Sequence, residues 1–180
     1  MGETLLRIDR QLFLLINHLP HNAFLNALGV GLSAIGTAGI IWLILGGILF
    51  LREEKKDHLF FAPIFLSAGA SWILVEKIIK PWIARSRPAL ELGTIIVGDG
   101  RTDFSFPSGH ATIAWALAVV LSHKEPKWKT VFFVLAFLIS FSRIYIGKHY
   151  PLDVIAGSAL GIGIGLVVSY VFDKRRKFAD

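Results

Sequence analysis

Long runs of apolar residues, separated by short polar and basic segments, dominate the sequence. A membrane-spanning helix needs about 20 predominantly apolar residues. Five runs reach or approach that length, and they predict five spanning helices at residues 23–51, 59–79, 108–121, 131–146 and 151–172. The third run is short for a span, so we expect its end to lie in the membrane interface or in a water-filled cavity.

The N-terminal segment has a different pattern. Apolar residues recur near helical spacing within residues 1–20, but Arg7 and Arg10 interrupt them. The longest uninterrupted apolar run in the segment, residues 12–16, is too short to cross a bilayer. We therefore predict an amphipathic helix that lies in the membrane interface before the first span.

The composition supports an integral membrane protein. Of the 180 residues, 54% are hydrophobic and only 18% are charged. The net charge is +6, but the basic residues lie mainly between the apolar runs, which argues for a lipid bilayer and against nucleic acid as a partner. The absence of cysteine excludes disulfides, zinc–thiolate sites and cysteine nucleophiles. The predicted fold class is all-α: one domain over residues 1–180, forming a polytopic membrane helix bundle of about five to six helices.

Basic residues gather after the first, third and fifth predicted spans, and they include Arg52, Lys127 and Lys174. With five spans, these segments share one membrane face, which the positive-inside rule assigns to the cytoplasm. We therefore predict a multi-pass protein of the inner or plasma membrane with a cytoplasmic C-terminus. The opposite, outer or periplasmic face then holds the N-terminal helix, the junction at 143–153 and the connection at 80–107, which we interpret as an active-site loop.

Residues suited to binding phosphate lie on that outer face. Lys80, Arg87 and Arg143 could surround one point with positive charge, and guanidinium groups match phosphate oxygens. Ser108 is a suitable N-cap for the third span, and the N–H groups at a helix N-terminus attract anions. Gly109 leaves its backbone N–H open to close approach. Together these residues predict a phosphate site that needs no metal.

Two histidines and an aspartate predict a reaction at that site. His149 precedes Asp153 by four residues at the start of the fifth predicted span. A carboxylate there can accept from one imidazole nitrogen and leave the other nitrogen free to attack. His110, in the first turn of the third span, can protonate a leaving oxygen. The pattern thus combines a nucleophile, an orienting group and an acid.

Each residue also has a purely structural explanation. Lys80 could pair with Glu76 one helical turn earlier, and Asp153 could complement a helix dipole. Arg85 and Asp103 in the long connection are expected to be solvated loop charges. The convergence of all the candidates on one membrane face is what favours a catalytic site over these separate explanations.

Three glycines in the fifth span recur every fourth residue, at Gly157, Gly161 and Gly165. Small residues at that spacing allow two helices to approach closely. We expect this surface to pack within the chain rather than against a second copy.

The candidate residues resemble the signature of the type 2 phosphatidic-acid phosphatase superfamily, a membrane family that shares its core with vanadium haloperoxidases. That signature is a lysine, six residues and Arg-Pro; then Pro-Ser-Gly-His; then Ser-Arg, five residues, His, three residues and Asp. The matching positions here are Lys80, Arg87-Pro88, Pro107 to His110, Ser142-Arg143, His149 and Asp153.

The resemblance implies an integral membrane phosphatase that uses neither a metal nor a cofactor. It implies that His149 attacks phosphorus and forms a phosphohistidine, that Asp153 orients His149, and that His110 protonates the leaving group. It further implies that the phosphoryl oxygens are held by Lys80, Arg87, Ser108, Gly109 and Arg143.

The resemblance also implies a membrane lipid phosphate as the substrate. Undecaprenyl diphosphate is the leading candidate, because an outward-facing site would suit recycling of that carrier; the alternatives are phosphatidylglycerophosphate, phosphatidic acid and lipid A 1-phosphate. A membrane phosphatase for a soluble ester and a non-enzymatic lipid-binding or transport protein are the competing classes. A lateral opening between helices would favour a lipid, and a closed, water-facing pocket would favour a soluble ester. The oligomeric state stays open.

Overall fold

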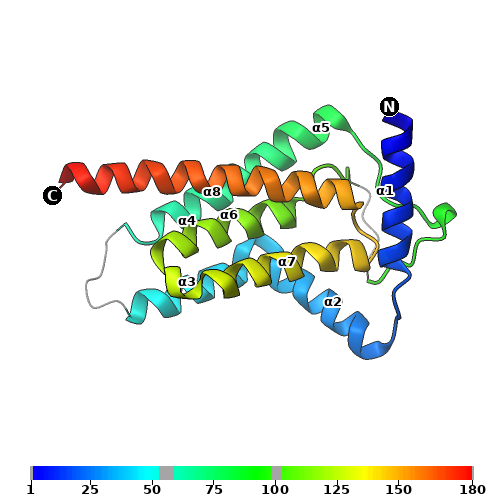
Figure 1. Ribbon diagram of the computed structural model, residues 1–180, viewed down its shortest axis with the longest axis horizontal. Coiled ribbons are helices and arrows are strands. Elements are labelled where there is room, and N and C mark those ends of the chain that lie inside the picture. Colours follow the sequence, from blue (N-terminus) through cyan, green and yellow to red (C-terminus); the bar gives the residue numbers. More distant parts are fainter. Residues whose placement is uncertain (1, 53–58, 99–102, 180) are drawn as a thin grey trace.

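The computed structural model describes residues 2–52, 59–98 and 103–179, and every regular element in those ranges is a helix (Figure 1). The predicted all-α membrane bundle is confirmed. The helices are α1 (Gly2–Asn17), α2 (Ala23–Gly36), α3 (Ile40–Arg52), α4 (Ala62–Trp72), α5 (Lys80–Ile83), α6 (Gly109–Lys124), α7 (Lys129–Tyr145) and α8 (Pro151–Ala179), with short 3-10 turns at Thr37–Gly39, Leu90–Leu92 and Pro126–Trp128.

Within the described ranges, three helical stretches are long and apolar enough to cross a membrane. They are Ala62–Ile83, Pro126–Tyr145 and Pro151–Lys174, and the bent pair α2 and α3 adds a fourth if it counts as one span. The α6 helix has 16 residues, so the third predicted span is short, as expected. Of the five predicted spans, three are therefore found as spanning helices, the first is found as a bent pair, and the third, α6, is not among the stretches long and apolar enough to cross.

The first span is not continuous, so the prediction of one helix over residues 23–51 was wrong. Its two halves, α2 and α3, meet at an angle of 65° around the 3-10 turn Thr37–Gly39. Two local features explain the break. The Thr37 hydroxyl donates to the carbonyl of Ser33 at 3.2 Å, and Gly39 has a φ of +76°, which is the left-handed region that favours glycine. The break places Thr37 against α6.

The second span continues past its predicted end. Between α4 and α5 the chain forms a π-helical segment, Ile73–Ile79, and the whole stretch is helical from Ala62 to Ile83. Lys80 therefore belongs to the end of a helix and not to the following loop. Its ammonium group bonds Glu76 one turn earlier at 2.8 Å. The helix ends at Ala84, whose φ of +50° is left-handed, and the connection begins there.

The central helix of the bundle is α6, whose residues from 111 to 122 are buried almost without exception. It packs most extensively against α8. A Cβ atom on Gly157 would lie 2.6 Å from the carbonyl oxygen of Ser108, and one on Gly165 would lie 2.7 Å from that of Ala116. The repeated glycines therefore allow backbone contact within the chain, as expected.

The N-terminal helix α1 lies across one end of the bundle, at a large angle to the spanning helices (Figure 1). Its position in the membrane interface stays a prediction. Its buried side consists of Asp9, Phe13 and Asn17, spaced four residues apart. The Asn17 amide bonds both backbone groups of Ile95 and the carbonyl of Tyr145 at 2.8–2.9 Å, which fastens the long connection and the end of α7 to α1.

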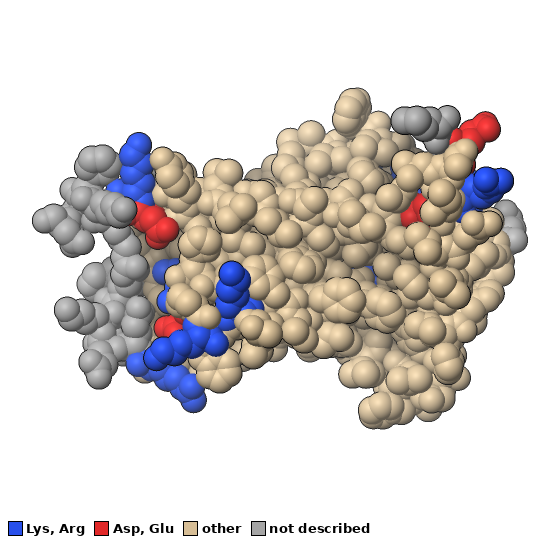
Figure 2. All heavy atoms as spheres, in the orientation of Figure 1, with Lys and Arg blue, Asp and Glu red and all other residues tan. Residues whose placement is uncertain are grey.

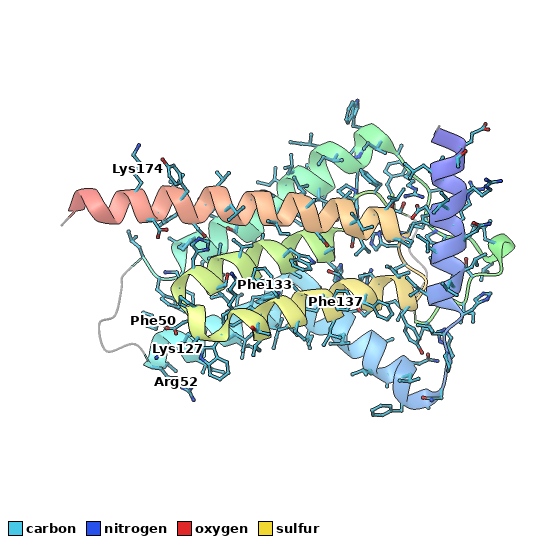
Figure 3. All side chains as sticks on the ribbon, viewed as in Figure 1. Phe50, Arg52, Lys127, Phe133, Phe137 and Lys174 are labelled. Carbon is cyan, nitrogen blue, oxygen red and sulfur yellow. The ribbon has the colours of Figure 1, made fainter. Side chains whose placement is uncertain are left out.

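Charged side chains gather toward the two ends of the bundle, and a wide uncharged surface separates them (Figure 2). Arg52, Lys127 and Lys174 lie together at the end opposite α1 (Figure 3). The predicted grouping of these three basic residues on one face is therefore confirmed, and α1 lies on the other face.

Candidate active site

The predicted site residues meet around one cavity of about 360 Å³. Five of the eight line it: Lys80, Arg87, Gly109, His110 and His149. The other three lie behind the cavity wall and are buried, namely Ser108, Arg143 and Asp153. The structure thus brings together residues from the second, third, fourth and fifth predicted spans and from the loops between them.

The start of α6 is built as predicted. Ser108 is its N-cap, and the hydroxyl accepts from the backbone N–H of Ala111 at 3.5 Å. The backbone N–H of Ser108 donates to the carbonyl of Asp153 at 2.9 Å, so the first turns of α6 and α8 are joined directly. Gly109 follows Ser108 and lies close to the side chain of Glu76. A Cβ atom added at Gly109 would lie 2.9 Å from Oε1 of Glu76.

The tautomer of His149 follows from its contact with Arg87. The Nη1 atom of Arg87 lies 3.1 Å from Nε2 of His149 and also donates to the carbonyl of Lys148 at 2.7 Å. A guanidinium group can only donate, so Nε2 accepts and carries no proton. Burial, together with the positive charges of Arg143, Arg87 and Lys80, holds the pKa of His149 well below 6.5. The imidazole is therefore neutral at pH 7, with its proton on Nδ1.

Asp153 lies next to that proton. Its Oδ2 atom is 3.5 Å from Nδ1 of His149 and accepts from the backbone N–H of Tyr150 at 2.9 Å. Its Oδ1 atom accepts from Nη1 of Arg85 at 2.6 Å. Nδ1 of His149 makes no hydrogen bond to any residue that the structure describes. Catalytic hydrogen bonds often form fully only when substrate binds, so the position of Asp153 suits an orienting carboxylate.

The two cations at the cavity share an acidic partner. Asp103 accepts from Nζ of Lys80 at 3.1 Å and from Nε and Nη2 of Arg87 at 3.1 and 3.0 Å. Burial alone would raise the pKa of Asp103, but the hydrogen bonds and charges of Arg87 and Lys80 outweigh it and hold that pKa well below 3.8. Lys80 also pairs with Glu76, so its structural role is real and coexists with its place at the cavity. The expectation that Asp103 is a solvated loop charge was wrong.

His110 contacts a residue that sequence reasoning missed. Its Nε2 atom lies 3.3 Å from the hydroxyl of Thr37, at the break in the first span. Because that hydroxyl donates its hydrogen to Ser33, it accepts from His110, and Nε2 of His110 therefore carries a proton. The glycines at 36 and 39 were the available signal for a break at this position.

Arg143 lies behind His149 and not on the cavity surface. Its guanidinium group donates to the hydroxyl of Ser33, and its carbonyl accepts from the backbone N–H of His149 at 3.2 Å. It is buried in α7, and its charge contributes to the lowered pKa of His149. Arg143 therefore acts on the site through its contact with the His149 backbone and through its charge.

Arg85 also departs from its predicted role as a solvated charge. It pairs with Asp153 and, through Nη2, with Oδ2 of Asp9 at 2.5 Å. Asp9 was overlooked because its partner lies 76 residues away, which no local spacing reveals. Among the residues that the structure describes, no group of three or more His, Asp or Glu side chains is arranged to hold a metal ion.

Comparison with known proteins establishes the family. The sequence model of the PAP2 superfamily matches residues 59–177, which is well over half of the chain. The chain belongs to the PAP2 superfamily. This finding confirms the resemblance drawn from the three motifs, and all eight predicted site residues lie inside the matched PAP2 region.

Relatives of this PAP2 protein carry several substrate names. It is 35% identical to an undecaprenyl-diphosphatase of Sulfolobus acidocaldarius, over 92% of this chain and 79% of the relative. It is 32% identical to a lipid A 4'-phosphatase of Porphyromonas gingivalis, over 94% and 75% of the two chains. It superimposes on the crystal structure of a PAP2-type phosphatidylglycerolphosphate phosphatase from Bacillus subtilis with a TM-score of 0.74 and 25% identity, covering 95% and 87%. The protein is thus a multi-pass membrane lipid phosphatase.

Proposed function

We propose that this protein removes a phosphate group from a membrane lipid through a phosphohistidine on His149, at the outer face of the inner or plasma membrane, with undecaprenyl diphosphate as its lead substrate. One catalytic domain spans residues 1–180. The observation that carries the proposal is the unprotonated Nε2 of His149, which lines the cavity beside the cations Lys80 and Arg87.

The first step transfers the phosphoryl group to the protein. The lone pair on Nε2 of His149 attacks phosphorus while the bond from phosphorus to the leaving oxygen breaks. In the proposed mechanism His110 starts as an imidazolium, with a proton on each nitrogen. Its Nε2 proton passes to that leaving oxygen, which leaves His110 neutral. Asp153 accepts the Nδ1–H of His149, which stabilises the positive charge on the His149 imidazole. Negative charge on the phosphoryl oxygens is neutralised by Lys80 and Arg87, which line the cavity, and by the α6 N-terminus at Ser108 and Gly109. Arg143 adds positive charge from behind His149.

The second step releases phosphate. His110, now neutral, takes a proton from water, and the oxygen of that water attacks phosphorus. The bond from phosphorus to Nε2 of His149 breaks, and its electron pair returns to the nitrogen. Inorganic phosphate leaves, and both histidines regain their starting protonation. Each step uses groups of the chain itself, so we propose a metal-independent reaction.

The walls of the cavity support a lipid substrate over a soluble ester. Trp72 and Lys77 line it from the second span, and both are exposed on the outer surface of that helix, with Trp72 50% exposed. Thr37 lines it from the break in the first span. A cavity bounded by two spans in this way lets a head group enter sideways while the apolar tail stays in lipid. A closed pocket for a soluble ester would lack such a border.

Two observations support undecaprenyl diphosphate ahead of phosphatidylglycerophosphate, phosphatidic acid and lipid A 1-phosphate. One is the 35% identity to a relative with that activity in its name. The other is Lys77, a further cation that lines the same cavity as Lys80 and Arg87 and offers a partner for a second phosphate group.

The direct test is phosphate release by the purified protein in detergent with EDTA present. The panel contains the four lipids named above and glucose 6-phosphate, and His149→Ala is the matched inactive control. We expect release from the lipids, fastest with undecaprenyl diphosphate, and none from the His149 variant. Turnover by His149→Ala would overturn the mechanism. Release that requires a divalent metal would overturn metal independence, and release from glucose 6-phosphate alone would overturn the lipid assignment.

The proposed orientation rests on the basic residues at the end opposite α1. Because the chain contains no cysteine, single cysteines report their side of the membrane without background. We expect a membrane-impermeant maleimide to label Leu90→Cys in the connection from outside the cell, and Lys174→Cys only after permeabilisation. The reverse pattern would place the site on the cytoplasmic face.

A further inference from the structure

We infer that Asp9, in the N-terminal helix, positions the catalytic Asp153–His149 pair by acting through Arg85. On this inference α1 supports catalysis in addition to lying across the end of the bundle. The inference rests on the proposed role of His149 as the nucleophile, and it adds two positioning residues that do not touch the substrate.

Arg85 forms a bridge between two carboxylates. Its Nη2 atom lies 2.5 Å from Oδ2 of Asp9, and its Nη1 atom lies 2.6 Å from Oδ1 of Asp153. The guanidinium carbon lies 4.2 Å from the centroid of the Tyr150 ring, so Arg85 also makes a cation–π contact with that ring. A planar guanidinium with two directed donors fits this geometry, whereas the single ammonium of lysine does not.

Asp9 also holds the helix that carries Asp153. Its second oxygen, Oδ1, accepts from the backbone N–H of Leu152 at 2.8 Å, in the first turn of α8. Asp153 accepts from the backbone N–H of Tyr150 in the same region. Both carboxylates therefore bind free N–H groups at the α8 N-terminus, which fixes the turn on which the orienting carboxylate lies.

Burial makes the bridge sensitive to the loss of one member. Asp9 is 2% exposed, Asp153 is 0% exposed, and the Arg85 side chain is 18% exposed. Two carboxylates face one guanidinium, so Asp9, Arg85 and Asp153 together carry one net negative charge beside His149. If Asp9 were neutral, the Arg85 charge would act on Asp153 alone and would weaken its attraction for the Nδ1 proton of His149.

The effect should appear in turnover and not in substrate affinity. Neither Asp9 nor Arg85 lines the cavity that holds Lys80 and His149. The other charged groups that act on His149 are Arg87 from the connection, Arg143 from α7 and Lys80 from the end of the second span. A change at Asp9 leaves all of these in place.

The test compares Asp9→Asn with Glu3→Gln in the purified protein. Asparagine keeps the size of Asp9 and an oxygen for Leu152, and Glu3 is an exposed acid on the same helix. For Asp9→Asn we expect kcat to fall on the order of tenfold to a hundredfold with KM within about twofold, and the acidic limb of kcat/KM to move to lower pH. Glu3→Gln should match the parent protein in all three quantities.

Arg85→Lys provides the second variant, and it decides the question if Asp9→Asn does not fold. It keeps the charge but not the bridge, so we expect the same loss of kcat. Parent-like kcat in either folded variant would overturn the inference. A loss of kcat with an unmoved acidic limb and a lower thermal midpoint would also overturn it, because that result indicates only a structural role. Activity in His149→Ala would instead overturn the proposed function itself.

Discussion

Arg87 donates to Nε2 of His149 across 3.1 Å, so the atom proposed to attack phosphorus is hydrogen-bonded in the substrate-free protein. The same guanidinium group is a proposed ligand of the phosphoryl oxygens. We expect the Arg87 donors to turn to those oxygens when phosphate binds, which would free the Nε2 lone pair. In the proposed mechanism, one side chain thereby couples substrate binding to activation of the nucleophile.

The first prediction concerns the pH dependence of kcat/KM. In the proposed mechanism His149 attacks only when it is neutral, and burial together with nearby cations lowers its pKa below 6.5. As the pH falls, the free enzyme therefore keeps its reactive form through pH 6.5 and loses it only at lower pH. We expect the acidic limb of a kcat/KM profile to lie below pH 6.5. An acidic limb at or above that value would contradict the lowered pKa.

The second prediction concerns Asp103, whose carboxylate lies between Lys80 and Arg87. An ionised carboxylate there competes with phosphate for the same donors. We expect Asp103→Asn to bind inorganic phosphate about three- to tenfold more tightly, a gain of roughly 1 kcal/mol. The measurement is the inhibition constant of phosphate against lipid turnover.

Asp173→Asn is the control for this change, because it makes the same substitution at an exposed position near the other end of α8. It should leave phosphate inhibition unchanged. If Asp103→Asn instead weakened phosphate inhibition, the carboxylate would be organising the two cations for the substrate and not competing with it.

The order of the helices could be predicted from the lengths of the apolar runs, but two boundaries could not. The apolar run itself gives no sign of a bend, and Gly36 and Gly39 are the only local hint of one. The break at Thr37 depends on a side-chain bond to Ser33 and on the conformation of Gly39. The charge of Lys80 ends the second apolar run, yet the helix continues because Glu76 pairs with that charge.

The residues that gather around the cavity could be predicted because their signals are local, and their catalytic roles stay a prediction. The spacing of His149 and Asp153 and the N-cap at Ser108 are visible within a few positions of sequence. The partners that complete the site are distant in sequence: Asp9 meets Arg85 across 76 residues, and Thr37 meets His110 across 73. Contacts of that range arise from the packed fold and leave no periodic trace in the sequence.

The third prediction separates diphosphate from monoester substrates. Lys77 lines the cavity and lies 5.1 Å from the Trp72 ring centroid, at the exposed side of the second span. If it neutralises the second phosphate, Lys77→Ala should lower kcat/KM for undecaprenyl diphosphate by roughly tenfold, or about 1.4 kcal/mol. The value for phosphatidic acid should change less than about twofold.

Lys127→Ala, an exposed lysine at the opposite end of the bundle, is the control for general effects of lost charge. Equal losses on the monoester and the diphosphate in Lys77→Ala would show that this lysine acts on the shared phosphate or on the protein surface. In that case the preference for a diphosphate would lose its structural support.

The fourth prediction concerns the contact between α6 and α8, compared at two glycines in the same helix. A Cβ atom on Gly161 would overlap the carbonyl oxygen of Thr112 and lie 3.1 Å from the backbone nitrogen of Ala116. Gly163 has no atom within 4 Å of its Cβ position. We expect Gly161→Ala to lower the free energy of unfolding by about 1–3 kcal/mol and Gly163→Ala to leave it unchanged or raise it by up to ~1 kcal/mol.

The measurement is the thermal midpoint of each variant in one detergent, together with its phosphatase activity. Backbone atoms of α6 cannot rotate away as a side chain can, so an added methyl group at Gly161 must push the two helices apart. His110 lies on one of these helices and Asp153 on the other, so the same displacement should also lower activity. Matching midpoints for the two alanine variants would mean that α6 and α8 adjust at little cost, and that the glycine spacing does not hold the two halves of the site together.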